Sequence, residues 1–308
     1  MAKGRVIVVT GPTATGKSAL ALALAERLGG TVINADAMQT YDAFPILTAQ
    51  PTAKERARVP HLLYGVLPLS DTLSAARWRT LATAEIECCI AQGRRPILCG
   101  GSGLYLRALM QGFAAVPDVP ATIRETANSQ WRQMGPEAFR ARLGERDPAI
   151  VARLKPGDRQ RHVRAWEVFL ATGRPLSQWQ EGEEAPAPWR FATLLLAPER
   201  SWLRPRIEKR FDAMLEQGVL GEVRAVFDSH PDPRWPSLKA HGAPELFGHL
   251  RGELPLENAR QIAIDHTRQY AKRQMTWFRH QMTPDLVLDP QSPQPLEEVA
   301  QYLTKMEG

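Results

Sequence analysis

The octapeptide G-P-T-A-T-G-K-S, from Gly11 to Ser18, restricts the fold of this chain more than any other segment. It matches G-x-x-x-x-G-K-[ST], a phosphate-binding loop that requires a buried strand before it and a helix after it. Both are predicted, because residues 5–10 (R-V-I-V-V-T) are a continuous β-branched run and residues 17–28 are rich in Ala and Leu. We therefore expect a phosphate site, the alternative being a chance match in a turn that binds no phosphate.

Further strand and helix patterns alternate after this loop. Residues 31–34 predict a second strand that ends just before Asp36, residues 74–92 a helix, and residues 96–99 a third buried strand that leads into G-G-S-G. Strands that alternate with helices form a parallel sheet. The predicted fold class is therefore α/β, a P-loop NTPase-like parallel sheet flanked by helices.

A change of composition near Pro117 and Pro120 indicates a second domain. From there to about Trp189 the chain is rich in Arg and Trp and lacks strand patterns, which return at residues 191–197. A length of 308 residues also exceeds what one compact core usually organises. We predict a P-loop α/β core with C-terminal helices, residues 1–116 and 190–308, and an inserted helical domain, residues 117–189.

The acidic residues near the loop limit its chemistry. Kinases and nucleotide hydrolases hold their metal with a carboxylate after another apolar strand, but the third strand here runs from Leu98 into Gly100 without one. The available acid is Asp36. From the residues alone it could ligate Mg²⁺, orient a substrate hydroxyl, accept a proton or cap the next helix. Lys17 is expected to neutralise phosphate charge, and Ser18 to ligate Mg²⁺.

Basic residues gather in three helical segments of a chain whose formal net charge is +6. Any one of them is explained by a solvated helix face. Together, with aromatic residues between them, they favour RNA as a partner. The segments contain Arg206 and Arg210, then Gln160, Arg161 and Arg164, and finally Arg268, Lys272 and Arg279.

Membrane and export signals are missing from the sequence. No run of 18 apolar residues occurs, and the first predicted strand begins too early for a signal peptide. The three cysteines lack the C-x-x-C spacing of metal sites and are expected to be small buried hydrophobes. We expect a cytoplasmic protein that does not bind membranes.

Five further motifs follow the octapeptide in order along the chain. They are N-A-D-A-M-Q-T-Y (34–41), G-G-S-G-L-Y (100–105), Q-R-H-V-R-A-W-E-V (160–168), R-I-E-K-R-F (206–211) and A-K-R-Q-M-T-W-F-R (271–279). With them, nearly the whole chain resembles bacterial tRNA dimethylallyltransferases, also called tRNA isopentenyltransferases. The phosphate loop is shared by many families, whereas most of the later motifs are specific to this one.

This resemblance implies transfer of a dimethylallyl group from its diphosphate to N6 of adenosine 37 of tRNA, with release of pyrophosphate. The phosphate loop then holds the prenyl diphosphate rather than ATP, which agrees with the missing metal carboxylate. By motif position Asp36 takes the N6 proton, and Lys17, Arg210 and Ser18 with Mg²⁺ stabilise the leaving group. The implied catalytic residues are Asp36, Lys17, Ser102 and Arg210, and the implied diphosphate site is Gly11, Pro12, Thr13, Ala14, Thr15, Gly16, Lys17 and Ser18, with Ser18 at the metal.

The resemblance also implies that the inserted domain clamps the anticodon stem-loop. We expect the protein to be a monomer. Base extrusion makes N6 accessible. The implied tRNA contacts are Asp36, Ala37, Met38, Gln39, Ser102, Arg124, Gln160, Arg161, His162, Val163 and Arg164.

The chain departs from the family pattern at three places, of which the first keeps a hydroxyl and the other two affect tRNA contacts rather than the phosphate site. Ser102 stands where Thr is usual. Residues 42–51 (D-A-F-P-I-L-T-A-Q-P) replace R-G-x-D-I-G-T-A-K-P, and Ala243 replaces an aromatic residue.

Two other functions share some of these features. A small-molecule or nucleotide kinase would also use the phosphate loop and Asp36 but needs no basic surface. A non-catalytic RNA-binding protein would keep the basic surface without chemistry.

Overall fold

The computed structural model describes residues 5–112, 114, 116–182, 185–293 and 295–307. It separates into two compact units, Met1–Met110 with Pro188–Gly308 and Gln111–Ala187. The change in composition predicts the inserted helical domain at residues 117–189, and the second unit spans Gln111–Ala187. Among the described residues, no helix is both long enough and apolar enough to span a membrane.

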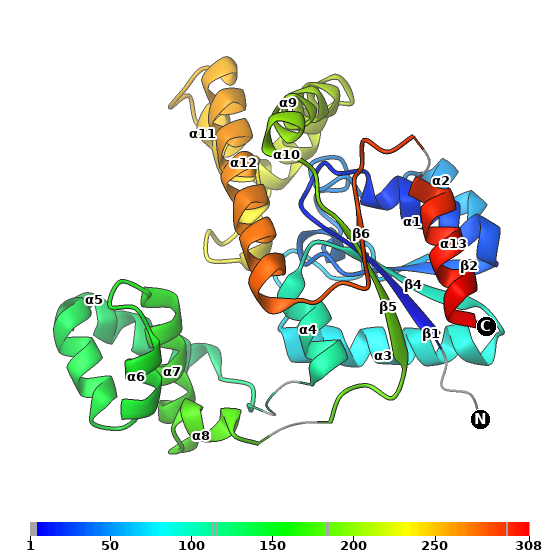
Figure 1. The fold of residues 1–308 in the computed structure, drawn as a ribbon. Coiled ribbons are helices and arrows are strands. Elements are labelled where there is room, and N and C mark those ends of the chain that lie inside the picture. The colour runs from blue at the N-terminus through cyan, green and yellow to red at the C-terminus, as the bar shows by residue number, and fades with distance from the viewer. Residues whose placement is uncertain (1–4, 113, 115, 183–184, 294, 308) are drawn as a thin grey trace. The chain divides into compact units, whose positions relative to one another are not determined.

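The first unit is built on a six-stranded sheet in the order β3-β2-β4-β1-β5-β6 (Figure 1). Every pairing is parallel, which confirms the predicted α/β class. Strand β1 lies in the middle because its residues are apolar and buried on both faces. The strands are β1 Arg5–Thr10, β2 Gly30–Asn34, β3 His61–Leu62, β4 Arg95–Gly100, β5 Arg190–Leu196 and β6 Leu286–Leu288.

Helices cover both faces of this sheet. On one face α1 (Lys17–Leu28) and α13 (Pro295–Glu307) pack against Ile7 and Val9 in a continuous apolar core. Alternate strand residues such as Val8 point to the other face, where α3 lies against β4 and β2. The helices before the insertion are α1 Lys17–Leu28, the 3₁₀ helix η1 Met38–Thr40, α2 Ala53–Arg58, α3 Ala75–Ala91 and α4 Gly103–Gln111.

A second core of the first unit lies beyond the carboxyl ends of the strands. It joins the loop that contains Phe44 and Leu47 to four α-helices and one 3₁₀ helix of the C-terminal part. This core positions helices beside the phosphate loop. The helices after the insertion are α9 Arg200–Glu216, α10 Val219–Asp228, η2 Pro236–Lys239, α11 Ala243–Leu250, α12 Leu256–Gln281 and α13 Pro295–Glu307.

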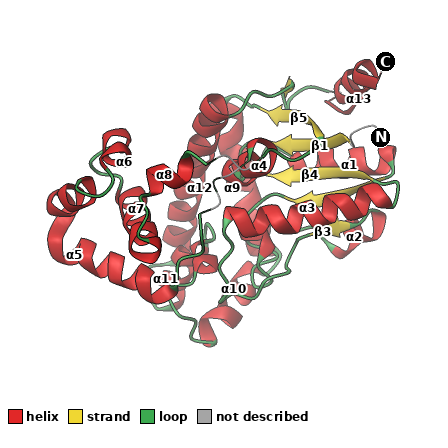
Figure 2. Ribbon diagram, turned by 90° about the horizontal axis from the view of Figure 1, so that it is seen from below, coloured by secondary structure: helices red, strands yellow, loops and turns green. Residues whose placement is uncertain are grey.

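The second unit contains only helices in its described part (Figure 2). Helix α5 is interrupted at Gly135, whose φ of 73° and following Pro136 break the regular backbone. The buried aromatic rings of Phe139 and Trp166 form the centre of its core. The helices are α5 Ala121–Gly144, α6 Pro148–Arg153, α7 Arg159–Thr172 and α8 Leu176–Gln180.

The cysteine expectation holds for two of the three residues. Cys89 and Cys99 are buried, whereas Cys88 is exposed. No cluster of three or more His, Cys, Asp or Glu able to hold a metal occurs in the described part of the chain.

Candidate active site

The octapeptide forms a loop between β1 and α1 that leaves backbone N–H groups available. Gly11 has φ +141° and packs so closely on Leu196 that a side chain would overlap its carbonyl. Gly16 precedes α1 and has no side chain with which to cap it. The first N–H groups of α1 are therefore free to bind an anion, aided by the helix dipole.

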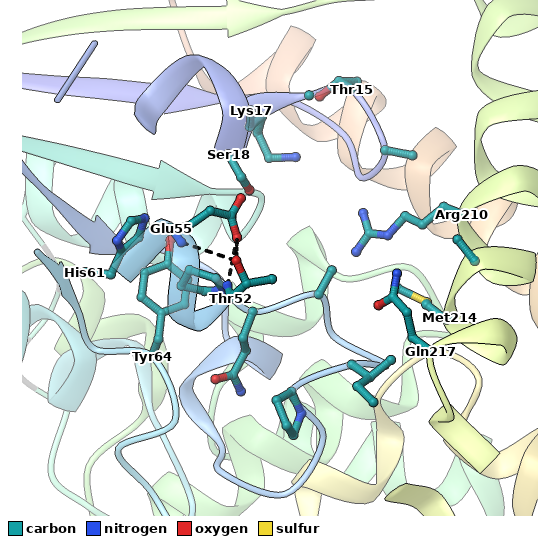
Figure 3. A pocket seen from close by; sticks show the side chains of 18 of the residues that line it. Thr15, Lys17, Ser18, Thr52, Glu55, His61, Tyr64, Arg210, Met214 and Gln217 are labelled. Atoms are coloured by element: carbon teal, nitrogen blue, oxygen red, sulfur yellow. Dashed lines mark hydrogen bonds between the residues drawn. The ribbon is translucent and has the colours of Figure 1, made fainter. Parts of the chain in front are cut away.

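Two cations point toward the space beside this loop, and Figure 3 shows them directed at one another across it. The Lys17 ammonium donates to the Pro12 carbonyl at 2.6 Å. Arg210, on α9, donates to Thr13 Oγ1 at 3.2 Å. Burial lowers the pKa of Lys17 to about 8, an effect that the nearby Cys99 and Asp36 oppose and Arg210 reinforces. Positive charge held in a partly buried place is suited to an anion such as diphosphate.

Arg206 reaches the same loop from the preceding turn of α9. Its Nε donates to the Ala14 carbonyl at 3.1 Å, and its guanidinium lies 4.3 Å from the Trp202 ring centre. The four-residue spacing predicted from the sequence thus brings both arginines of α9 to the phosphate loop.

Two cavities meet at the loop. The larger, about 840 Å³, extends toward Glu55, His61 and Tyr64 (Figure 3). The smaller, about 230 Å³, extends toward Asp36 and Tyr270. Both are lined by Ala14, Lys17, Ser18, Ala49, Arg210 and Met214. An anion on the loop would therefore be accessible from two directions, only one of which contains Asp36.

Asp36 follows β2, and one of its two carboxylate oxygens accepts a hydrogen bond. Oδ1 accepts at 3.0 Å from the N–H of Met38, the first residue of η1, although the N-cap position of η1 is Ala37. In the part of the chain that the structure describes, Oδ2 has no hydrogen-bond partner. The buried Asn34 holds the Asp36 backbone, because its Oδ1 accepts from the Asp36 N–H at 2.8 Å and its amide donates to the Asp36 carbonyl at 2.9 Å. One carboxylate oxygen is thus fixed and the other is available for chemistry.

Ser102 supports the same segment from the end of β4. Its Oγ accepts from the Ala37 N–H at 3.0 Å, and its own N–H donates to the Ala35 carbonyl at 3.1 Å. Gly100 permits this approach, because a Cβ there would overlap the backbone of Ala35. The structure therefore brings Ser102 to the backbone on either side of Asp36.

The neighbouring residues of the 34–41 motif line the smaller cavity. Ala37, Met38 and Gln39 are half-buried there. The Gln39 amide is already occupied, because it donates to the carbonyls of Thr48 and Ala49 at 2.8 and 2.9 Å. Gln39 thus orders the loop that follows it.

The donors near the loop fit magnesium held mainly by a ligand's own oxygens. The hydroxyl of Ser18 and the carboxylate of Asp36 line the same small cavity. Glu55 is less available, because its carboxylate accepts from both the N–H and the hydroxyl of Thr52. Mg²⁺ prefers such oxygen donors and usually keeps several waters or phosphate oxygens.

The predicted contacts of the second unit are not all on its surface. Gln160 and Arg161 are exposed, and Arg124 and Arg164 are half-buried. His162 and Val163 are 0% and 4% exposed and pack into the helical core beside Trp131 and Trp166. The helical repeat explains this, because residues 162, 163 and 166 share the inner face of α7.

Sequence patterns missed two residues that shape the site, His241 and Glu222. His241 and Tyr270 line the smaller cavity, with ring centres 4.3 Å apart. Glu222 on α10 accepts from the N–H groups of Ile46 and Leu47 at 2.7 and 2.9 Å and so holds the cavity wall. Tyr270 is one of the aromatic residues that lie between the basic residues of the segment from Arg268 to Arg279, and the structure places it at this cavity. Nothing local identifies His241 or Glu222.

Two positions expected to depart from the family pattern, Leu47 and Ala243, belong to the same apolar core. The Leu47 side chain lies over Gly242, where a Cβ would be 2.9 Å from Leu47 Cδ1. Ala243, the next residue, is fully buried in the same core. A large residue at position 47 therefore accompanies a small one at position 243.

Comparisons with known proteins agree along the chain. The IPP transferase family model matches residues 39–281. The tRNA dimethylallyltransferase of Rhodospirillum centenum is 54% identical over 92% of this chain and 91% of its own length. That of Granulibacter bethesdensis is 52% identical over 91% and 88%.

Solved structures give the same result. A tRNA delta(2)-isopentenylpyrophosphate transferase from Staphylococcus epidermidis superposes with a TM-score of 0.71 at 30% identity, covering 99% of this chain and 100% of its own. A eukaryotic dimethylallyltransferase acting on tRNA reaches 0.82 at 26% identity, covering 98% and 79%.

Proposed function

This chain belongs to the IPP transferase family of tRNA dimethylallyltransferases, and from that premise we propose how its residues transfer a dimethylallyl group to tRNA. The donor is dimethylallyl diphosphate and the acceptor is N6 of adenosine 37. The new bond joins N6 to the allylic carbon, the C–O bond to the diphosphate breaks, and the electron pair leaves with pyrophosphate. The observation that carries the assignment is the cationic loop at the junction of two cavities, with the free oxygen of Asp36 in only one.

The diphosphate is assigned to residues 11–18. Lys17 and Arg210 face one another at this place, and the amino end of α1 adds further N–H donors. These groups stabilise charge that increases as the C–O bond breaks, which is where fixed donors accelerate a reaction most. Mg²⁺, when held by Ser18 and the diphosphate oxygens, supplies additional positive charge to the leaving group.

The target adenine is assigned to the smaller cavity. Asp36 Oδ2 is the acceptor for the proton that N6 loses, while Oδ1 keeps its bond to Met38 and fixes the carboxylate. His241 and Tyr270 offer aromatic faces against which a flat base can stack. An extruded base satisfies this arrangement.

The anticodon stem-loop is the proposed partner of the basic residues, with the protein acting as a monomer. In the helical unit the accessible side chains Gln160, Arg161 and Arg164 are suited to contact RNA, together with Arg124. His162 and Val163 are assigned a supporting role, because they are buried beneath them.

Nucleoside analysis tests the reaction directly. Unmodified tRNA is incubated with the protein, dimethylallyl diphosphate and Mg²⁺, then digested and analysed by mass spectrometry. We expect N6-dimethylallyladenosine from a wild-type anticodon stem-loop and none when adenosine 37 is replaced by guanosine. Wild-type RNA that stays unmodified would refute the function.

A thermal-shift measurement separates the transferase from a kinase. The melting temperature is expected to rise with dimethylallyl diphosphate and Mg²⁺, as binding to the native state requires. Stabilisation by ATP with Mg²⁺ alone would favour phosphoryl transfer instead.

A further inference from the structure

A single buried glutamine joins the phosphate loop to the turn that carries Ser102. Gln274 lies on α12 and is 6% exposed. Its Oε1 accepts from the Thr13 N–H at 2.9 Å, and its Nε2 donates to the Gly101 carbonyl at 3.0 Å. Both ends of one amide are therefore bonded to backbone groups of segments that are far apart in the chain.

The turn after β4 has glycines where α12 packs against it. A Cβ on Gly101 would overlap Gln274 Nε2, and a Cβ on Gly103 would overlap the Trp277 ring. No positive φ requires glycine at either position, so the close approach of α12 accounts for both. The amide of Gln274 thus has little freedom to occupy another position.

Each end of this amide leads to a different part of the proposed site. On one side, Thr13 also accepts from Arg210 through its hydroxyl. On the other, Gly101 precedes Ser102, which bonds to the backbone of Ala35 and Ala37 on either side of Asp36.

Helix α12 adds a third connection. Tyr270, one turn before Gln274, lines the smaller cavity. Residues four apart on a helix lie on the same side, so one face of α12 contacts both the cavity and the loop.

We propose that Gln274 is a positioning residue that sets the phosphate loop and the Asp36 segment at the separation needed for transfer. Gln274 lines neither of the two cavities. The inference rests on the proposed function, because its importance lies in aligning the diphosphate carbon with the acceptor nitrogen. Small errors in such alignment have large effects on rate.

Two variants test this positioning role, one at Gln274 and one at its partner Gly101. Gln274→Met keeps the approximate volume but removes both hydrogen bonds, leaving the half-buried Thr13 N–H and the buried Gly101 carbonyl without their partner. Gly101→Ala keeps the glutamine but displaces its amide. Gln261→Met is the matched control, because Gln261 is an exposed glutamine of the same helix whose side-chain amide donates to Asp265.

Calorimetric binding of inorganic pyrophosphate and single-turnover prenyl transfer are the two measurements. For each test variant we expect pyrophosphate affinity and transfer rate to fall by about tenfold, while Gln261→Met stays at the wild-type values. The double variant Gln274→Met with Gly101→Ala is expected to be no slower than the worse single one, because both break the same contact.

If Gln274 only contributes to packing, the variants will have a lower melting temperature but, well below that temperature, the wild-type pyrophosphate affinity and transfer rate. That result would overturn the proposal. The proposal would also be overturned if the loss of transfer rate in the double variant equalled the product of the losses in the two single variants. If Gln274→Met fails to fold, Gly101→Ala decides alone. Failure of the proposed function is recognised separately, because a wild-type protein that binds pyrophosphate but makes no product still allows the binding comparison.

Discussion

Replacing Asp36 by Asn tests the proposed general base with little disturbance of the fold. The amide oxygen can still accept from the Met38 N–H, which Asp36 Oδ1 does at 3.0 Å. The Asn34 bonds to the backbone of residue 36 are also unaffected. The change therefore removes the basic oxygen and leaves the local structure in place.

The expected loss follows from these contacts. A general base contributes roughly 10² to 10⁴ in rate, or about 2.7 to 5.4 kcal/mol of activation free energy. Asp36→Ala removes the same base and also the bond to Met38, which is worth about 1 kcal/mol. We expect Asp36→Ala to be slower than Asp36→Asn by a further factor of about five.

Single-turnover kinetics provide the measurement. Enzyme in excess over an anticodon stem-loop is mixed with saturating donor and Mg²⁺, quenched at intervals and analysed for N6-dimethylallyladenosine. Asp42→Asn is the control, because Asp42 is an exposed carboxylate of the same segment outside both cavities. An Asp36→Asn enzyme as fast as the wild type would disprove the assignment of the base.

Three further predictions concern the loop, the RNA surface and the cavity wall. Because the pKa of Lys17 is lowered to about 8, its charge is present below that pH and lost above it, so kcat/KM for the donor should fall as the pH rises through about 8. Lys17→Arg should remove this fall, whereas a fall that persists would assign it to another group. Arg161→Ala should reduce the slope of log Kd for RNA against log salt by about 1, while Gln160→Ala leaves the slope unchanged. Unchanged slopes in both would place Arg161 away from phosphate. Glu222→Ala unpairs two backbone N–H groups and should lower the free energy of unfolding in urea by about 1 to 3 kcal/mol, compared with no change for the exposed Glu216→Ala.

Local rules explain what could be predicted. The phosphate loop, strand β1 and helix α1 are specified by neighbouring residues, since glycine freedom, β-branching and helix propensity act within a few positions. The α/β class follows from alternating strand and helix patterns. The position of Asp36 at the ligand-binding edge follows from the end of one apolar run.

Local rules could not predict the shortest strands or which side chains of a helix point toward the core. Strands β3 and β6 have two and three residues, too few to produce a recognisable pattern, and become strands because a neighbouring strand offers hydrogen-bonding partners. The burial of His162 could not be read from its polarity, because the packing of α7 against α5 determines which residues face the core.

The sequence by itself therefore determined the class of ligand, the family and the residues that could carry charge. Tertiary structure alone decided which of them meet. Gln274 reaches Thr13 across 261 positions, and Glu222 reaches Ile46 across 176. The conformational preferences of neighbouring residues do not encode such pairs. These hydrogen bonds form only when the packing of the apolar cores brings the two distant segments together.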